Sequence, residues 1–429
     1  MKFVSTVLLS TLCMAAIAQE PKNVIMVVGD GMGPAYTTAY RYFADDRTTS
    51  AVEQTVFDRL LVGMASTYPA RVSGYVTDSA AGATALSTGI KTYNGAIAVD
   101  VDKEPVQTVL EWAKKQGMKT GVAVTSQINH ATPAGYSSHN ESRKNYNEIA
   151  DSYFDRKVAN TFVLDVMLGG GWNYFKRDDR DLVTEFTDAG YQYVDTISAL
   201  QNTDVSKPLL GLFADKGLNW ALDMPDKQRL QTLTQAAVKH LENDKGFFLL
   251  VEASQVDWAG HSNDVGAAMG EMQDLAQTMT WLEQYVDAHP DTLVVLTADH
   301  STGGFTIGAD TIYKWEPQWL ENLKASPFNI AKQIMATNNK AALASELLGF
   351  TLTEDEKSLV NAIDTQDEEI AYQTIKTLLD LRTNTGWTTG GHTGVDVPVF
   401  AKGPGSEKFR GLLNNTQVAD NIFTLLGRK

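Results

Sequence analysis

Short, continuous apolar runs alternate along the chain with longer stretches in which apolar residues recur every three or four positions. The short runs are rich in Val, Leu and Phe and hold few charges, which is typical of strands buried in a parallel sheet. The longer stretches have the spacing of helices with one apolar face. The expected strands are 23–29, 118–126, 247–252, 293–298 and 397–401, and the expected helices are 105–116, 141–153, 227–241 and 264–286.

This alternation predicts an α/β fold with a central, mostly parallel sheet flanked by helices on both faces. A chain of 429 residues, 43% of them hydrophobic and 21% charged, can bury a large core. The sequence shows no internal repeat, low-complexity tract or linker. Residues 19–429 are therefore expected to form one domain.

Residues 308–382 differ from the rest because they are rich in Trp, Lys, Asn and Glu. Helix-like segments at 327–336 and 339–348 lie within this region, which separates two segments that carry candidate site residues. We interpret it as an inserted surface subdomain. It is either a solvated helical excursion or a functional element, a lid or a dimer arm, and the sequence leaves these alternatives open.

The N-terminus has the pattern of a signal peptide, with Lys2 followed by an apolar run over 3–17 that ends near Ala16 and Ala18. We predict residues 1–18 as the signal peptide, cleaved after Ala18. The alternative is a membrane anchor, but the run is short for a bilayer span of about 20 residues. The only cysteine, Cys13, lies in this segment, and export without disulfides suits a periplasmic or secreted protein.

The formal net charge is −16, and no other stretch is long and apolar enough to span a bilayer. This charge argues against nucleic acid or an anionic membrane surface as a partner of the mature protein. A negatively charged small molecule would have to be attracted locally, by metal ions or by a few placed cations.

Polar side chains follow several of the expected strands. Asp30 stands among glycines directly after the first strand, at the sheet edge where open parallel sheets bind ligands. His130 and Thr132 follow the second strand, and Glu252 ends the third. Taken singly, such residues are more often structural: Asp30 would cap a helix, and a lone His beside a Thr usually packs.

Two further residues suit the binding of an anion. Asp78 can cap a helix of small residues, which places Ser79 at the positive end of the helix dipole, where an alkoxide is stabilised. The alternative is a helix start that is merely tightly packed. Arg143 opens the expected helix 141–153 and could hold a phosphate bidentately, although most such arginines are solvated.

The most specific signal is a set of Asp and His pairs. Asp257 and His261 are four positions apart and would share one helix face, so both can bind one ion. Asp299 and His300 are adjacent at another strand end, and His392 lies in a Gly-rich loop. Buried Asp and His would be costly without a metal, so their convergence on one sheet edge predicts a metal site.

With these residues in this order, the chain resembles the alkaline phosphatase family over nearly the whole mature sequence. The marks that carry the resemblance most specifically are Asp78-Ser79-Ala80, Asp257 with His261, Asp299-His300 and His392-Thr393-Gly394.

The resemblance implies hydrolysis of phosphate monoesters, with Ser79 as the nucleophile that becomes a phosphoserine and Arg143 holding the phosphoryl oxygens. It also implies three metal ions as cofactors. One Zn²⁺ would be bound by Asp257, His261 and His392, a second Zn²⁺ by Asp30, Asp299 and His300, and a Mg²⁺ by Asp30, Thr132 and Glu252.

His130 and Trp258 stand where the enterobacterial enzyme has Asp and Lys, and both are expected to border the substrate. Marine, vibrio-type members of the family look like this sequence at these positions. Their long surface loop resembles the 308–382 insertion, which implies a homodimer.

Two classes of alternative remain from the sequence. A phosphodiesterase, a sulfatase or a phosphate-transferring mutase would use the same metal scaffold. A periplasmic protein that scavenges phosphate or zinc without turnover would explain the ligands, but not a serine placed for alkoxide formation.

Overall fold

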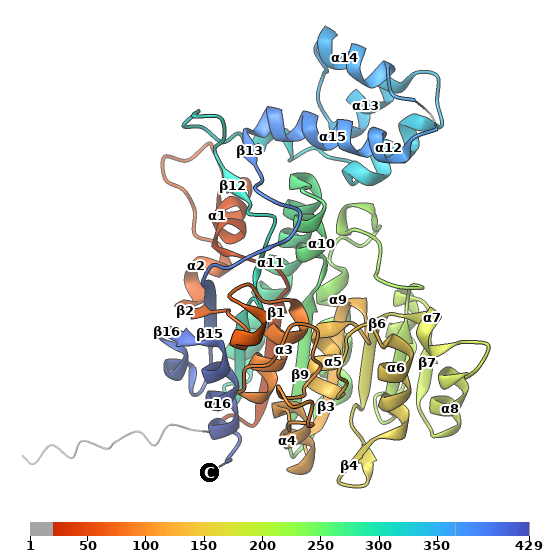
Figure 1. The fold of residues 1–429 in the computed structure, drawn as a ribbon, viewed down its shortest axis with the longest axis vertical. Helices are drawn as coiled ribbons and strands as arrows, with labels where there is room; N and C mark the ends of the chain where they lie inside the picture. Colours follow the sequence, from red (N-terminus) through yellow and green to blue (C-terminus); the bar gives the residue numbers. More distant parts are fainter. Residues whose placement is uncertain (1–19, 365, 429) are drawn as a thin grey trace, which may run out of the picture.

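The computed structural model describes residues 20–364 and 366–428, so the predicted signal peptide lies outside the described residues. Its core is a ten-stranded sheet (Figure 1). From one edge to the other the strands are β16 (Gly411–Asn414), β2 (Leu61–Ser66), β15 (Val397–Lys402), β10 (Thr292–Thr297), β1 (Asn23–Gly29), β9 (Phe247–Ala253), β3 (Lys119–Gln127), β6 (Val166–Gly170), β8 (Leu209–Leu212) and β7 (Gln192–Val194).

The predicted mostly parallel sheet is confirmed, with one exception among the expected strands. Strands β10, β1, β9, β3, β6, β8 and β7 pair in parallel. The run 397–401 forms β15, which is antiparallel to both β10 and β2. An apolar run shows that a strand is buried, but its direction depends on the path of the connecting chain.

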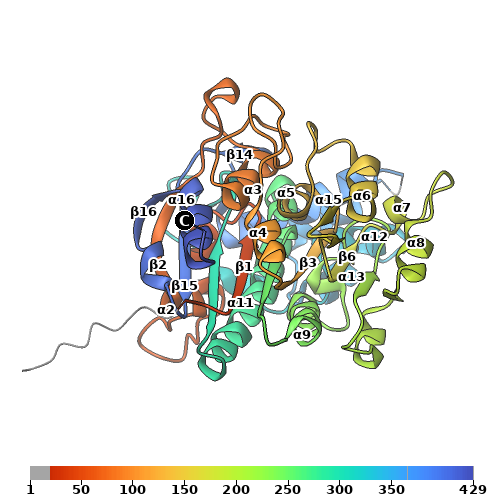
Figure 2. The same cartoon turned by 90° about the horizontal axis from the view of Figure 1, so that it is seen from below.

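Helices cover both faces of the sheet, which is why the central strands read as unbroken apolar runs. Every residue of β1, β9 and β10 is buried. Figure 2 shows the two helical layers on opposite sides of the sheet. One layer holds α3 (Ser79–Thr88), α4 (Val109–Lys115), α5 (Ala131–Ser137) and α16 (Asn415–Leu425), and the other holds α1 (Pro34–Phe43), α2 (Val56–Leu60), α9 (Arg229–Leu241) and α11 (Val265–Ala288).

The expected helices are present, but two of them begin later than the apolar pattern suggests. Helix α4 begins at Val109 because Thr108 caps it, its hydroxyl accepting from the backbone N–H of Glu111 at 3.1 Å. Helix α6 (Tyr146–Asp155) begins five residues after the predicted start at 141. The prediction that Arg143 opens a helix is therefore wrong, because Arg143 lies in the turn before α6.

Smaller elements complete the body. They are α7 (Trp172–Phe175), α8 (Leu182–Asp188), α10 (Gln255–His261), the two-residue ladder of β4 (Lys157–Val158) with β5 (Thr161–Phe162), and that of β11 (Ser301–Thr302) with β14 (His392–Thr393).

The region 308–382 projects from the body as a helical lobe, at the top of Figure 1. The chain enters and leaves it through a short antiparallel ladder of β12 (Thr306–Ile307) with β13 (Thr385–Gly386). Between these strands lie α12 (Pro327–Met335), α13 (Lys340–Leu348), α14 (Glu354–Asn361) and α15 (Glu368–Thr383).

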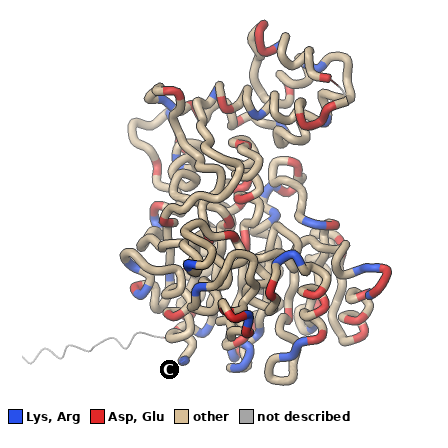
Figure 3. The backbone as a smooth tube through the Cα atoms, in the orientation of Figure 1, with Lys and Arg blue, Asp and Glu red and all other residues tan. Residues whose placement is uncertain are grey.

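Charged positions are spread over the whole surface, with no continuous basic band among the residues drawn in colour in Figure 3. Among the described residues, none of the helices is both long and apolar enough to cross a membrane. Any attraction of an anion must therefore come from a local site.

Candidate active site and metal centre

Three neighbouring strands bring the predicted acidic residues to one edge. In the sheet β10, β1 and β9 are adjacent and parallel, so their carboxyl ends coincide. Asp30 follows β1, Glu252 lies near the end of β9, and Asp299 follows β10; all three are fully buried. The sheet topology thus concentrates three carboxylates where an open parallel sheet places its ligands.

The first ligand group joins α10 to β14, because His392, which we expected in a loop, begins this short strand. In α10, Asp257 and His261 share one face, and Asp257 Oδ2 lies 3.3 Å from His261 Nε2. His392 Nε2 lies 3.1 Å from His261 Nε2 and 3.6 Å from Asp257 Oδ1. The Nδ1 atoms of the two histidines lie 2.6 Å and 2.8 Å from the carbonyl oxygens of Gly390 and Thr77, which leaves both Nε2 atoms facing the same point.

One positive charge between the two histidine rings would be stabilised by the Asp257 carboxylate. Hydrogen bonding to Asp257 raises the pKa of His261 to about 9. Burial and the neighbouring His300 lower the pKa of His392 to about 4. One proton or one divalent cation can therefore satisfy both histidines and the carboxylate, and two nitrogens with one oxygen suit zinc.

The second group is buried completely. His300 Nε2 lies 3.3 Å from Asp30 Oδ1 and 3.2 Å from Asp299 Oδ2. Burial and the charge of Asp299 raise the pKa of Asp30 well above its usual range. Burial would also raise the pKa of Asp299, but His300 outweighs it and holds that pKa below its usual value. The rings of His300 and His392 stack with centroids 3.6 Å apart, so the two groups are neighbours.

The third group is rich in oxygen. Ligand atoms of Asp30, His130 and Glu252 all lie within 4.8 Å of one another. The hydroxyl of Thr132 lies beside Glu252, and burial with the charge of Asp299 raises the pKa of Glu252 to about 7. Such a group of neighbouring carboxylates with a hydroxyl suits a hard cation such as Mg²⁺.

Buried atoms without a partner test whether these residues fit metal ions. Within residues 20–364 and 366–428, several ligand atoms at this edge are fully buried and have no hydrogen-bond partner. Unsatisfied buried oxygens are costly, and binding a cation would satisfy them. The atoms concerned are both carboxylate oxygens of Asp30, Oε1 of Glu252, Oδ2 of Asp299, Nδ1 of His130 and Oγ1 of Thr132.

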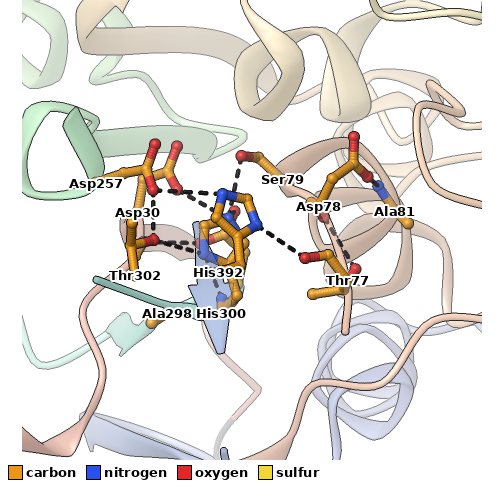
Figure 4. Close-up of polar contacts among 12 residues, drawn as sticks. Asp30, Thr77, Asp78, Ser79, Ala81, Asp257, Ala298, His300, Thr302 and His392 are labelled. Atoms are coloured by element: carbon orange, nitrogen blue, oxygen red, sulfur yellow. Dashed lines mark hydrogen bonds and ion pairs between the residues drawn. The ribbon is translucent and has the colours of Figure 1, made fainter. Parts of the chain in front are cut away.

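Ser79 lies at the junction of these groups. It is the first residue of α3 and is buried, and its Oγ lies 3.1 Å from His300 Nε2. Asp78 caps the helix by accepting from the backbone N–H of Ala81 at 3.0 Å (Figure 4). The hydroxyl therefore faces the second ligand group from the positive end of a helix.

Arg143 reaches the same place from its turn. Its Nη1 donates to Asp78 Oδ2 at 3.0 Å, and its Nη2 lies 3.3 Å from His130 Nε2. Burial and the Arg143 charge lower the pKa of His130 to about 3, so its ring is neutral. The rings of Trp258 and His130 are nearly perpendicular, with centroids 6.0 Å apart. The structure thus brings together every site residue proposed from the sequence.

The structure adds contacts that the sequence did not reveal. Thr302 donates to Asp257 Oδ1 at 2.5 Å and lies 3.2 Å from His300 Nδ1, which links the first two ligand groups (Figure 4). Asp78, expected only as a cap, also anchors Arg143. Only the position of Thr302, two residues after the Asp299-His300 pair, could have suggested its role.

Comparisons with known proteins identify relatives along almost the whole chain. The family model described as alkaline phosphatase matches residues 21–427. A Bacillus subtilis protein, alkaline phosphatase 3, is 48% identical over 415 residues, which is 95% of this chain and 89% of the relative.

Solved structures give the same relationship. A cold-active alkaline phosphatase from a psychrophilic Shewanella species is 50% identical, with a TM-score of 0.90 over 94% of this chain and 99% of the other. A His-to-Glu variant of the alkaline phosphatase from the Antarctic bacterium TAB5 is 28% identical, with a TM-score of 0.71 over 95% of this chain and 99% of the other. That variant was solved with Mg bound in its M3 site.

Proposed function

The chain belongs to the alkaline phosphatase family and is a phosphomonoester hydrolase, and from this premise we propose that Ser79 is its nucleophile. In the first step Ser79 Oγ attacks phosphorus, and the bond between phosphorus and the ester oxygen breaks. The alcohol leaves and the enzyme carries a phosphoserine. Water then attacks the phosphoserine, and phosphate is released while the hydroxyl of Ser79 is restored.

The local structure supports this role for Ser79. Its position at the first residue of α3 gives an oxyanion the stabilisation of the helix dipole. Small residues follow it, Ala80, Ala81 and Gly82, and they let the start of α3 pack close to Asp299. Ser79 Oγ lies 3.1 Å from Nε2 of His300, a residue of the second ligand group.

Arg143 would hold the phosphoryl oxygens. Its guanidinium is fixed from one side by the carboxylate of Asp78 and contacts neutral His130 on the other. Arginine carries five N–H donors, so these two contacts leave others for a phosphate. The rigid placement of the fork favours the doubly charged phosphoryl group of a monoester.

The three ligand groups fit two Zn²⁺ ions and one Mg²⁺ ion. Asp257, His261 and His392 would hold one zinc, and Asp30, Asp299 and His300 the other. Asp30, Thr132 and Glu252 would hold magnesium, a proposal supported by the Mg found in the TAB5 variant. When bound, such ions supply Lewis-acid stabilisation of charge on the reacting oxygens and make water more acidic.

The observation that carries this proposal is the buried Ser79 hydroxyl at a helix N-terminus, near buried carboxylate oxygens that accept no hydrogen bond from the described residues. The test is hydrolysis of a chromogenic phosphate monoester by the mature protein and by Ser79→Ala, with and without zinc and magnesium. We expect metal-dependent turnover that rises into alkaline pH and falls by at least 1,000-fold in Ser79→Ala, as for loss of a nucleophile. Equal turnover by Ser79→Ala would refute the nucleophile.

Two further properties follow from the same reading. We propose that the mature protein is periplasmic or secreted. N-terminal sequencing of the exported protein tests this proposal, and the expected first residue is Gln19.

We also propose a homodimer in which the lobe, residues 308–382, contacts the second subunit. Sedimentation analysis would disprove the dimer if the pure protein had the mass of a monomer.

A further inference from the structure

Helix α15 of the lobe lies against the body through one face. Tyr372, Lys376 and Asp380 are spaced four residues apart, so they share that face, and each bonds to the body or to the chain returning to it. Tyr372 and Lys376 are buried, 8% and 5% exposed, which is unusual for a lysine. The three contacts define a brace made by a single helix.

The first link of the brace holds the segment that directly follows His261. Tyr372 donates its hydroxyl to Asp264 Oδ2 at 2.8 Å in a buried environment. Lys376 donates to the backbone carbonyl of Ser262. The other oxygen of Asp264 caps α11 by accepting from the N–H of Ala267 at 2.8 Å. This link therefore fixes the joint between α10, which carries two metal ligands, and α11.

The second link holds the segment that leads into His392. Asp380 accepts from Nε1 of Trp387 at 3.1 Å. The Trp387 ring stacks on Phe305, with centroids 4.7 Å apart and planes 26° apart. It also lies so close to Gly303 that a Cβ there would come within 2.7 Å of the ring. The chain is thus fixed three residues before Gly390, whose carbonyl oxygen lies 2.6 Å from Nδ1 of His261.

The two braced segments meet at the first ligand group, and this group lacks the support that the second one has. The side chain of His261 is 41% exposed, whereas that of His300 is 0% exposed and is packed on all sides. The sheet and its flanking helices hold His300. For His261 and His392, the contacts of α15 supply part of that constraint.

We propose that α15 is a positioning element for the Asp257, His261 and His392 metal group, acting through Tyr372 and Asp380 at the two ends of one helix face. The inference rests on the proposed function, since it assumes that this group binds zinc. Groups that hydrogen-bond a metal ligand commonly change metal affinity by about 10- to 100-fold, because they fix the orientation of the ligand. The carbonyl of Gly390 is such a partner of His261, and the brace holds the segment that carries it.

The experiment measures zinc affinity of the metal-free protein by competition with a chromogenic chelator, for the wild type, Tyr372→Phe and Trp387→Phe. Each variant removes one donor of the brace and keeps an aromatic ring in place. We expect one of the two tight zinc equivalents to weaken by about 10-fold in each variant, with the other unchanged. Excess zinc should then restore activity. Leu381→Ala, on the exposed face of α15, is the matched control and should leave both equivalents unchanged.

Zinc affinities equal to those of the wild type in both variants would overturn the proposal, even if melting temperatures fell, because α15 would then only attach the lobe. Equal weakening of both zinc equivalents would also overturn it, since the effect would not be confined to one group. A wild type that binds no zinc would instead refute the proposed function, so the two failures are distinguishable.

Discussion

Replacing Gly82 by Ala tests how closely α3 packs against Asp299, which we propose as a metal ligand. A Cβ at position 82 would lie 3.0 Å from both Cβ and the carbonyl oxygen of Asp299. Asp299 is fully buried, so it must move by a few tenths of an ångström or strain its neighbours. Alanine favours the helix by about 1 kcal/mol, and overpacking costs about 1–3 kcal/mol. The free energy of unfolding should therefore fall by at most about 2 kcal/mol.

Activity should fall much further than stability. Displacing a ligand by about 1 Å can cost about 100-fold in rate, so a shift of a few tenths of an ångström should lower kcat by about 10-fold. The assays are chromogenic ester hydrolysis at saturating zinc and magnesium, and urea unfolding of the same samples.

Gly135→Ala is the matched control, because its Cβ would approach Ala83 at 3.1 Å and no metal ligand. We expect a similar change in unfolding free energy for the control, with kcat close to that of the wild type. Wild-type kcat for Gly82→Ala, or an equal loss in both variants, would refute the argument that the Asp299 contact sets the geometry of the site.

Three other predictions concern substrate binding, metals and acid stability. Arg143→Lys loses the fork that bonds Asp78 and that we propose holds the phosphoryl group, and should lower kcat/KM by about 10- to 100-fold in steady-state assays, the equivalent of one charge-assisted hydrogen bond. Chelation should abolish turnover and lower the melting temperature in calorimetry, and added zinc should reverse both, because ions that bind only the folded state stabilise it. Burial would raise the pKa of Glu111, but the hydrogen bond and charge of His139 and the charge of Arg156 lower it to about 2. Stability from this group is therefore complete above about pH 4.5 and disappears as the pH falls toward 2, so Glu111→Gln should cost about 3 kcal/mol in urea unfolding at pH 6 and little at pH 2. A cost independent of pH would contradict the role of the ion pair.

The central strands could be predicted from the sequence because they are buried on both faces. The run that forms β1 is apolar from Val24 to Val28 and stops at Gly29, so its bounds agree with the structure. Strand β2 was missed although Leu61 to Ala65 are apolar, because this run directly continues helix α2, which ends at Leu60, and nothing in the sequence marks the boundary between them. The direction of β15 could not be predicted, because it depends on the path of the chain after the lobe.

The site was predictable to the extent that its residues follow strands. Asp30, Glu252 and Asp299 all lie at strand ends, and the sheet order then brings them together. Contacts between separate loops carry no such pattern. Thr302 meets Asp257 and α15 meets Asp264 only after the chain has folded, and neither spacing nor composition marks these pairs.

The positions of the proposed ligands along the chain determine when the metal site can assemble. The ligand groups draw on residues from Asp30, near the start of the described chain, to His392, near its end. A chain emerging from its N-terminus acquires the last ligand only when almost all of it has been synthesised. Closing so long a loop is slow, and it must precede tight metal capture. Metal uptake would then report that folding is complete, and fragments that stop short of His392 would leave the first ligand group unfinished.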